Sequence, residues 1–166
     1  MLNPTPDFRE GESLLVAGIG GRYTSTTKSA IPDLWWRFVP FLGKIPNQIG
    51  GGVTYGVCFN PDGHGGFDYI AAAPVSSADD LLEGFRALTI PASRYAVFSH
   101  GLDLSTLPQT WQFAFHWLPG SSYRLADGPQ FERYSADFHP EAGKGSLEVW
   151  IPVLPDGRPA RAAVTS

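Results

Sequence analysis

Two segments of this chain repeat each other at an offset of 76 residues, and this repeat limits the folds that the sequence can adopt. The segment IPDLW at 31–35 aligns with LPQTW at 107–111, and FL at 41–42 aligns with WL at 117–118. Both segments carry apolar residues at the three- and four-residue spacing of an amphipathic helix. The sequence therefore predicts two main helices, over 29–45 and 105–118.

Capping and helix-breaking residues mark the expected ends of the two helices. Ser29 is a candidate N-cap with Pro32 in the first turn, and Pro40 is expected to kink the first helix or end it early. Pro119-Gly120 stops the second helix.

The segments around these helices have the alternation and turn residues of β-strands. The same offset places Tyr55 on Phe131, and an offset of 80 places Asp68 on Glu148. Strands are expected over 8–19, 53–60, 67–75, 85–90, 94–101, 130–138 and 146–153.

Each half of the chain therefore reads as strand, helix, strand, strand. Two such units expose complementary apolar faces and are expected to pack about a pseudo-twofold axis. The predicted fold is α+β, with duplicated βαββ units that form an antiparallel sheet and two main helices around a central ligand cleft. One domain spans 1–153, with repeats at about 8–75 and 84–153, and 154–166 is expected to be a loose tail.

Composition excludes several functions. The 12 Lys and Arg residues are outnumbered by 16 Asp and Glu residues and form no basic run, so direct nucleic-acid binding is not expected. The single Cys58 and the scattered histidines give no metal-ligand spacing, and the glycines form no phosphate-binding loop, so no metal or cofactor is expected. We expect a cytoplasmic protein without a membrane segment.

Aromatic residues are abundant, with 11 Phe, 6 Tyr and 5 Trp, and they serve either a core or a ligand site. In the segment LEVWIPV at 147–153, alternation places Glu148 and Trp150 on one strand face. An acid in so apolar a strand either meets a ligand cation, or lies on a solvated face, or forms a salt bridge with Arg133 or Arg94.

Seven short motifs in order resemble the GyrI-like effector-binding domain, a module found alone or behind the DNA-binding part of AraC-type transcription activators. They are YGV at 55–57, GFDY at 66–69, IPASRYAVFSH at 90–100, TW at 110–111, WLPGSSY at 117–123, FERY at 131–134 and LEVWIPV at 147–153. The resemblance implies a duplicated βαββ fold whose central cleft binds small, often cationic and aromatic, molecules. It also implies that Glu148 faces the cleft and pairs with the ligand's charge.

Aromatic side chains are expected to line that cleft, although core packing is an equal alternative for the helical ones. The candidates are Tyr134, Trp150, Trp111, Phe115, Trp36 and Tyr55. Asp68 is either a second acid in the cleft or a turn cap. Glu132 shares a strand face with Tyr134, and of these two we favour Tyr134 as the ligand contact.

The predicted function is non-catalytic binding of lipophilic, aromatic cations, in a sensor or a sequestration role. No helix-turn-helix segment is expected here, so a regulatory role would need a separate protein partner. The alternatives are a hydrolase of reactive small-molecule toxins that uses Glu148 as general base, and a protein-interaction domain with a filled cleft.

Overall fold

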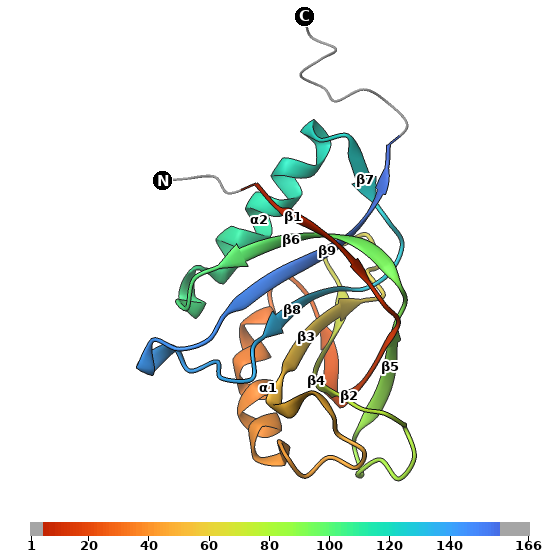
Figure 1. The fold of residues 1–166 in the computed structure, drawn as a ribbon, viewed down its shortest axis with the longest axis vertical. Coiled ribbons are helices and arrows are strands. Elements are labelled where there is room, and N and C mark those ends of the chain that lie inside the picture. The colour runs from red at the N-terminus through yellow and green to blue at the C-terminus, as the bar shows by residue number, and fades with distance from the viewer. Residues whose placement is uncertain (1–4, 157–166) are drawn as a thin grey trace, which may run out of the picture.

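The architecture is one antiparallel sheet with two helices on one face (Figure 1), in a computed structural model that describes residues 5–156. Within this range the sheet has nine strands, in the order β1-β6-β9-β8-β3-β4-β2-β5, and β7 pairs with β9. The strands are β1 Asp7–Gly11, β2 Leu14–Tyr23, β3 Thr54–Phe59, β4 Phe67–Pro74, β5 Arg86–Ile90, β6 Ser93–His100, β7 Tyr123–Leu125, β8 Gln130–Tyr134 and β9 Leu147–Pro155. The helices are α1 Ile31–Phe38 and α2 Leu107–Trp117.

The strand order is symmetric about its centre. Strands β3, β4 and β2 mirror β8, β9 and β6, and β3 pairs with β8 in the middle of the sheet. The two outermost strands are exchanged, because β1 adds to β6 and β5 adds to β2. This arrangement confirms the predicted α+β fold with an antiparallel sheet and two main helices.

Helix α1 is shorter than the predicted 29–45. Pro32 lies in its first turn as expected, and Pro40 ends it, because Val39–Phe41 continue only as a 3₁₀ turn. The N-cap is Ala30 rather than Ser29, which belongs to the preceding 3₁₀ turn. The helix buries Leu34 and Phe38 completely against the sheet.

Helix α2 begins two residues later than predicted, behind the 3₁₀ turn η4 (Leu104–Thr106). The Asp103 side chain accepts a hydrogen bond from the Ser105 N–H and so caps that turn. Ala114 is fully buried against the sheet. No helix within 5–156 is long and apolar enough to cross a membrane.

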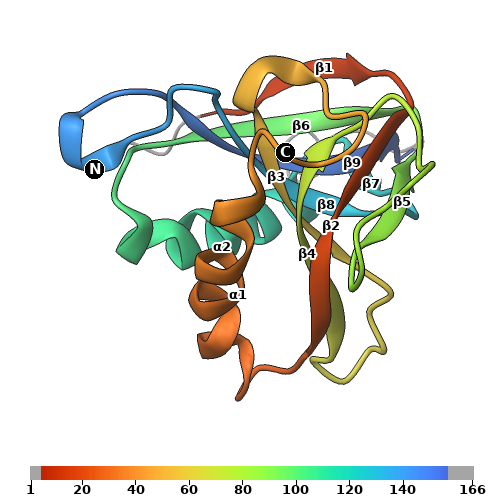
Figure 2. The same cartoon turned by 90° about the horizontal axis from the view of Figure 1, so that it is seen from below.

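Both helices lie on the same face of the sheet (Figure 2), which we call the helix face. It carries Ala17, Ala71 and Ala73 under α1, and Ala96, Val149 and Ile151 under α2. The opposite face has its own core, in which residues of both halves pack on one another, among them Val16, Tyr55, Val57, Tyr95 and Phe131. Each central strand is therefore buried on two sides.

Several element boundaries differ from the prediction. The first predicted strand is two strands, and the second of them runs through Gly20-Gly21 to Tyr23. Position 20 requires glycine in this strand, because a Cβ there would collide with the Tyr69 carbonyl of β4. Strand β8 stops at Tyr134, and β9 continues to Pro155, inside the expected tail. The rest of that tail, 157–166, lies outside the described residues.

Candidate functional site

Glu132 is a buried acid at the centre of the sheet. It lies on β8 opposite Gly56 of β3 and Val149 of β9, so its side chain rises from the helix face. Only 7% of the residue is exposed. The helix face at this point is covered by α1 on one side and α2 on the other.

The carboxylate of Glu132 accepts three hydrogen bonds from uncharged side chains. The Tyr69 and Tyr134 hydroxyls donate to Oε1, each at 2.9 Å, and the Trp111 indole N–H donates to Oε2 at 3.0 Å. The Trp35 indole N–H in turn donates to the Tyr69 hydroxyl at 2.9 Å. We call these five residues the carboxylate cluster.

The cluster draws its members from both repeats. Trp35 and Trp111 occupy equivalent positions of α1 and α2 at the offset of 76, and each indole N–H points into the cluster. Gly56 and Glu132 are equivalent at the same offset and pair directly with each other. The carboxylate therefore lies at the centre of the duplicated fold, where its counterpart is a glycine.

Gly56 provides the space in which the cluster forms. A Cβ at this position would collide with the Tyr69 hydroxyl and would lie 2.6 Å from Glu132 Oε1. Any larger residue would therefore displace the tyrosine from the carboxylate.

Burial dominates the electrostatics of the cluster. Desolvation raises the pKa of Glu132 above the ordinary glutamate value, and the hydrogen bonds from Trp111, Tyr134 and Tyr69 partly oppose this shift. Desolvation and the nearby Glu132 charge raise the pKa of Tyr69 and of Tyr134. None of the ion pairs within residues 5–156 involves Glu132. The hydrogen-bond donors to this buried acid are thus uncharged side chains, and a smaller electrostatic effect of His100 also lowers its pKa.

Aromatic rings extend from the carboxylate cluster toward solvent. Trp111 stacks on Phe115, one helical turn away, with ring centres 6.2 Å apart and an interplanar angle of 15°. Phe115 is 39% exposed. On the other side, the Trp35 ring meets Tyr134 edge-on at 5.1 Å. The flanking surfaces of both helices are therefore aromatic.

The residues expected at the cleft divide between the two faces of the sheet. The helix face brings together Trp111, Phe115 and Tyr134. Tyr55 and Trp150 belong to the core on the opposite face. Trp36 is 76% exposed on α1 and takes no part in the carboxylate cluster.

Glu148 lies on the opposite face and already has partners. Its register neighbour on β8 is Arg133, but its ion pair is with Arg9 of β1, at 3.4 Å. It also accepts a hydrogen bond from the Trp150 indole at 3.0 Å. The sequence predicted that Glu148 faces the ligand cleft or else pairs with Arg133 or Arg94; strand alternation instead turns it to the face opposite the helices, where Arg9 is its ion-pair partner.

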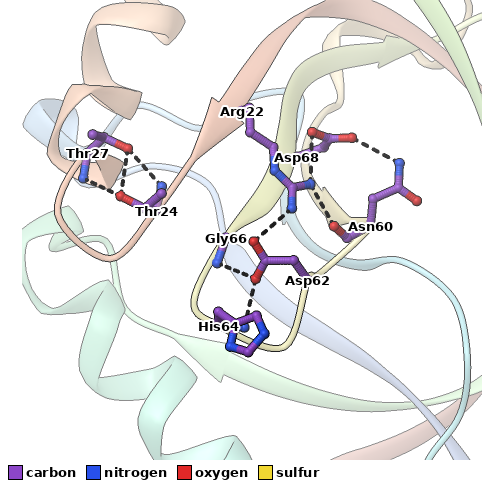
Figure 3. Close-up of polar contacts among 8 residues, drawn as sticks. All are labelled: Arg22, Thr24, Thr27, Asn60, Asp62, His64, Gly66 and Asp68. Carbon is purple, nitrogen blue, oxygen red and sulfur yellow. Dashed lines mark hydrogen bonds and ion pairs between the residues drawn. The ribbon is translucent and has the colours of Figure 1, made fainter.

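Asp68 is likewise paired, at one end of the sheet (Figure 3). It contacts the Arg22 guanidinium at 3.2 Å and accepts a hydrogen bond from the Asn60 side-chain amide at 2.9 Å. The bond from Asn60 and then the nearby Arg22 lower the pKa of Asp68. Asp62 pairs with the same arginine at 3.3 Å and caps the turn before β4. This cluster stabilises the β3–β4 hairpin.

Sequence reasoning undervalued Glu132 and did not select Tyr69 or Trp35. The usable signal was the central repeat position itself, where Glu132 aligns with Gly56. An acid that pairs with a glycine on the pseudo-twofold axis indicates that its side chain occupies the space that the glycine leaves free.

An open groove of about 490 Å³ lies apart from these residues. It runs between η4 and the 3₁₀ turn Pro140–Ala142, and its walls include Leu102, Asp103, Leu104 and Glu141. No member of the carboxylate cluster lines it.

Comparison with known proteins finds one family model that matches nearly the whole chain, and similarity to a transcriptional regulator and to a DNA gyrase inhibitor. The GyrI-like small molecule binding domain model matches residues 4–154. The transcriptional regulator BrlR of Pseudomonas aeruginosa is 28% identical over 133 residues, 79% of this chain and 49% of BrlR. A DNA gyrase inhibitor of Erwinia billingiae is 36% identical over 72 residues, 43% of this chain and 46% of that protein.

The matches thus span about half the length of these two relatives. The fold is similar to that of SAV2435 bound to tetraphenylphosphonium, with a TM-score of 0.74 and 21% identity over 90% of this chain and 93% of that one. The chain belongs to the GyrI-like small molecule binding domain family.

Proposed function

We propose that this chain binds one small aromatic cation between α1 and α2, with the Glu132 carboxylate as its counter-charge. The observation that carries this proposal is a buried acid whose partners are all neutral. Removal of a carboxylate from water costs several kcal/mol unless a charge compensates for it. Hydrogen bonds from two tyrosines and a tryptophan offset part of that cost, and a bound cation would offset the rest.

The aromatic residues beside the carboxylate suit a ligand of this class. A cation over an aromatic face gains about 0.5–2 kcal/mol, and planar groups stack on rings. Trp111 and Phe115 form a stacked pair that leads from Glu132 to the exposed surface of α2. We propose that the exposed Phe115 ring moves aside to admit the ligand while Trp111 keeps its hydrogen bond to Glu132, and that both rings then pack against the ligand, because Glu132 is almost completely covered in the present arrangement.

The counter-charge is assigned to Glu132 in place of Glu148. Arg9 lies 3.4 Å from Glu148, so that carboxylate needs no charge from a ligand. Of the ligand contacts expected from the sequence, Trp111, Phe115 and Tyr134 lie on the same face as Glu132, and we retain these three. Tetraphenylphosphonium, bound by the structurally similar SAV2435, is an aromatic cation and supports the ligand class.

The proposal is tested by titration of the protein with tetraphenylphosphonium, monitored by tryptophan fluorescence and calorimetry. Triphenylphosphine oxide serves as an uncharged aromatic control. We expect the cation to bind and the neutral compound to bind far more weakly. Equal affinity for the two compounds, or no binding of either, would contradict the proposal.

The cellular role would then be that of a ligand sensor or a sink for toxic cations. The similarity to part of a transcriptional regulator supports the sensor role, in which a DNA-binding partner reads the bound state. A hydrolase would instead need a lone pair on Glu132 for a catalytic water, and protein donors already occupy three positions on this carboxylate. Recovery of the unaltered ligand after prolonged incubation, measured by mass spectrometry, distinguishes binding from turnover.

A further inference from the structure

We infer that the site selects cations that carry no N–H group, so that it recognises charge without a hydrogen bond to the ligand. This inference rests on the proposed role of Glu132 as counter-charge. It concerns the chemistry of the cationic centre, and it follows from how the hydrogen-bonding positions of that carboxylate are occupied.

An ionised carboxylate offers about four lone-pair positions to donors. In Glu132 the protein itself occupies three of them, two on Oε1 and one on Oε2. Oε1 is thus fully occupied, and about one position remains, on Oε2 beside the Trp111 indole. A ligand has little opportunity to donate a hydrogen bond there.

Neighbouring buried residues hold the two tyrosine donors in place. Tyr69 is 2% exposed, and its hydroxyl accepts a hydrogen bond from Trp35 while it donates to Glu132. Tyr134 is 8% exposed and is packed between the rings of Trp35 and Phe138. Neither hydroxyl can leave the carboxylate without losing its partner in a buried environment.

The carboxylate itself has little freedom to reorient. Oε1 lies directly above Gly56, so close that a Cβ there would be 2.6 Å away. A cation with an N–H group would therefore displace the Trp111 indole or bury its own donor without a partner. A buried donor without a partner weakens binding by about tenfold or more. A quaternary ammonium or phosphonium ion has no such donor, and it gains the attraction of the charge and the contact with the rings.

The test compares two ligands that differ at one group. The diphenylmethyl-trimethylammonium ion has a methyl group where the diphenylmethyl-dimethylammonium ion, protonated at neutral pH, has an N–H group. Affinities are measured by calorimetry for the wild-type protein, for Tyr134→Phe and for the control Tyr95→Phe. Tyr134→Phe keeps the ring and frees one lone pair of Glu132. Tyr95 lies on the opposite face, where its hydroxyl donates to the Pro91 carbonyl at 3.2 Å.

We expect the wild-type protein to bind the quaternary ion about tenfold more tightly than the N–H ion. The preference should shrink severalfold in Tyr134→Phe and stay unchanged in Tyr95→Phe. The variant comparison separates hydrogen bonding from the extra contact of the added methyl group, because that contact is present in all three proteins.

Two results would overturn the inference, and they differ from failure of the proposed function. Equal or tighter binding of the N–H ion by the wild-type protein would refute selectivity while cation binding stands. A preference that stays the same in Tyr134→Phe would show that the methyl contact, rather than the occupied carboxylate, sets it. If neither ion nor tetraphenylphosphonium binds, the proposed function fails, and the inference fails with it.

Discussion

Replacement of Glu132 by glutamine removes the negative charge at the centre of the sheet and keeps nearly the same shape. A monovalent cation about 5 Å from the carboxylate, at an effective dielectric constant of about 20, is attracted by about 3 kcal/mol. Loss of that attraction corresponds to roughly a hundredfold weaker binding. The amide oxygen of glutamine can still accept hydrogen bonds from Tyr69 and Tyr134, so the fold should be retained.

The assay is calorimetric titration with tetraphenylphosphonium at constant ionic strength, with Glu148→Gln as the matched control. Both substitutions remove one carboxylate from a central strand, but Glu148 is on the opposite face and pairs with Arg9. We expect the large loss only for Glu132→Gln. A similar affinity in Glu132→Gln and the wild-type protein, with both correctly folded by circular dichroism, would refute the reasoning.

We expect the stability and the cation affinity of the wild-type protein to change with pH in opposite directions. Because burial raises the pKa of Glu132, the folded protein holds this proton at pH values where the unfolded chain has lost it. The contribution of Glu132 to the free energy of unfolding is therefore complete below the ordinary glutamate pKa and is lost as pH rises through the raised value. Cation affinity should increase over the same interval, since only the ionised form pairs with the ligand. Glu132→Gln should show neither trend in urea denaturation and calorimetry.

Two further substitutions, and the control Glu148→Gln, test separate parts of the structure. Gly56→Ala forces a Cβ against the Tyr69 hydroxyl. We expect urea denaturation to show that the free energy of unfolding falls by about 1–3 kcal/mol. Unchanged stability would mean that the contact relaxes freely. Glu148→Gln should leave the cation affinity within about twofold of the wild type, because sites without shared partners couple weakly. A large loss of affinity would instead indicate that Glu148 is the counter-charge of the ligand. Arg22→Gln removes the contacts with Asp62 and Asp68, so hydrogen exchange should accelerate at the amides of the β3–β4 loop and stay unchanged in the central strands.

Local signals in the sequence predicted most of the fold. Apolar spacing identified both helices, and Pro40 correctly marked the end of α1. Alternation placed Tyr55, Val57 and Phe59 on one face of β3, as the structure has them. The ends of helices and strands were harder to predict where tertiary contacts decide them. The three-residue β7, for example, exists because it pairs with the end of β9, about 30 positions away in the chain.

The candidate site was harder to predict because it depends on which face of a strand meets the helices. Glu148 and Glu132 are both acids on central strands, and each directly follows a buried apolar residue, Leu147 or Phe131. Register between distant strands decides that Glu132 lies under the helices and that Glu148 meets Arg9 of the edge strand β1. Neither fact follows from spacing along the chain. Trp111, Phe115 and Tyr134, expected from the sequence as ligand contacts, lie on the same face of the sheet as Glu132, and their role in binding stays a prediction.

The pairing of Gly56 with Glu132 gives a reason why the two βαββ units belong in one polypeptide. A dimer of identical single units would place the same residue at both positions. Two glutamates there would compete for one space and repel each other, and two glycines would leave no charge. Because the two copies are joined in one chain, their sequences are free to differ at this point of contact, and a nearly symmetric scaffold carries a single charge at its centre.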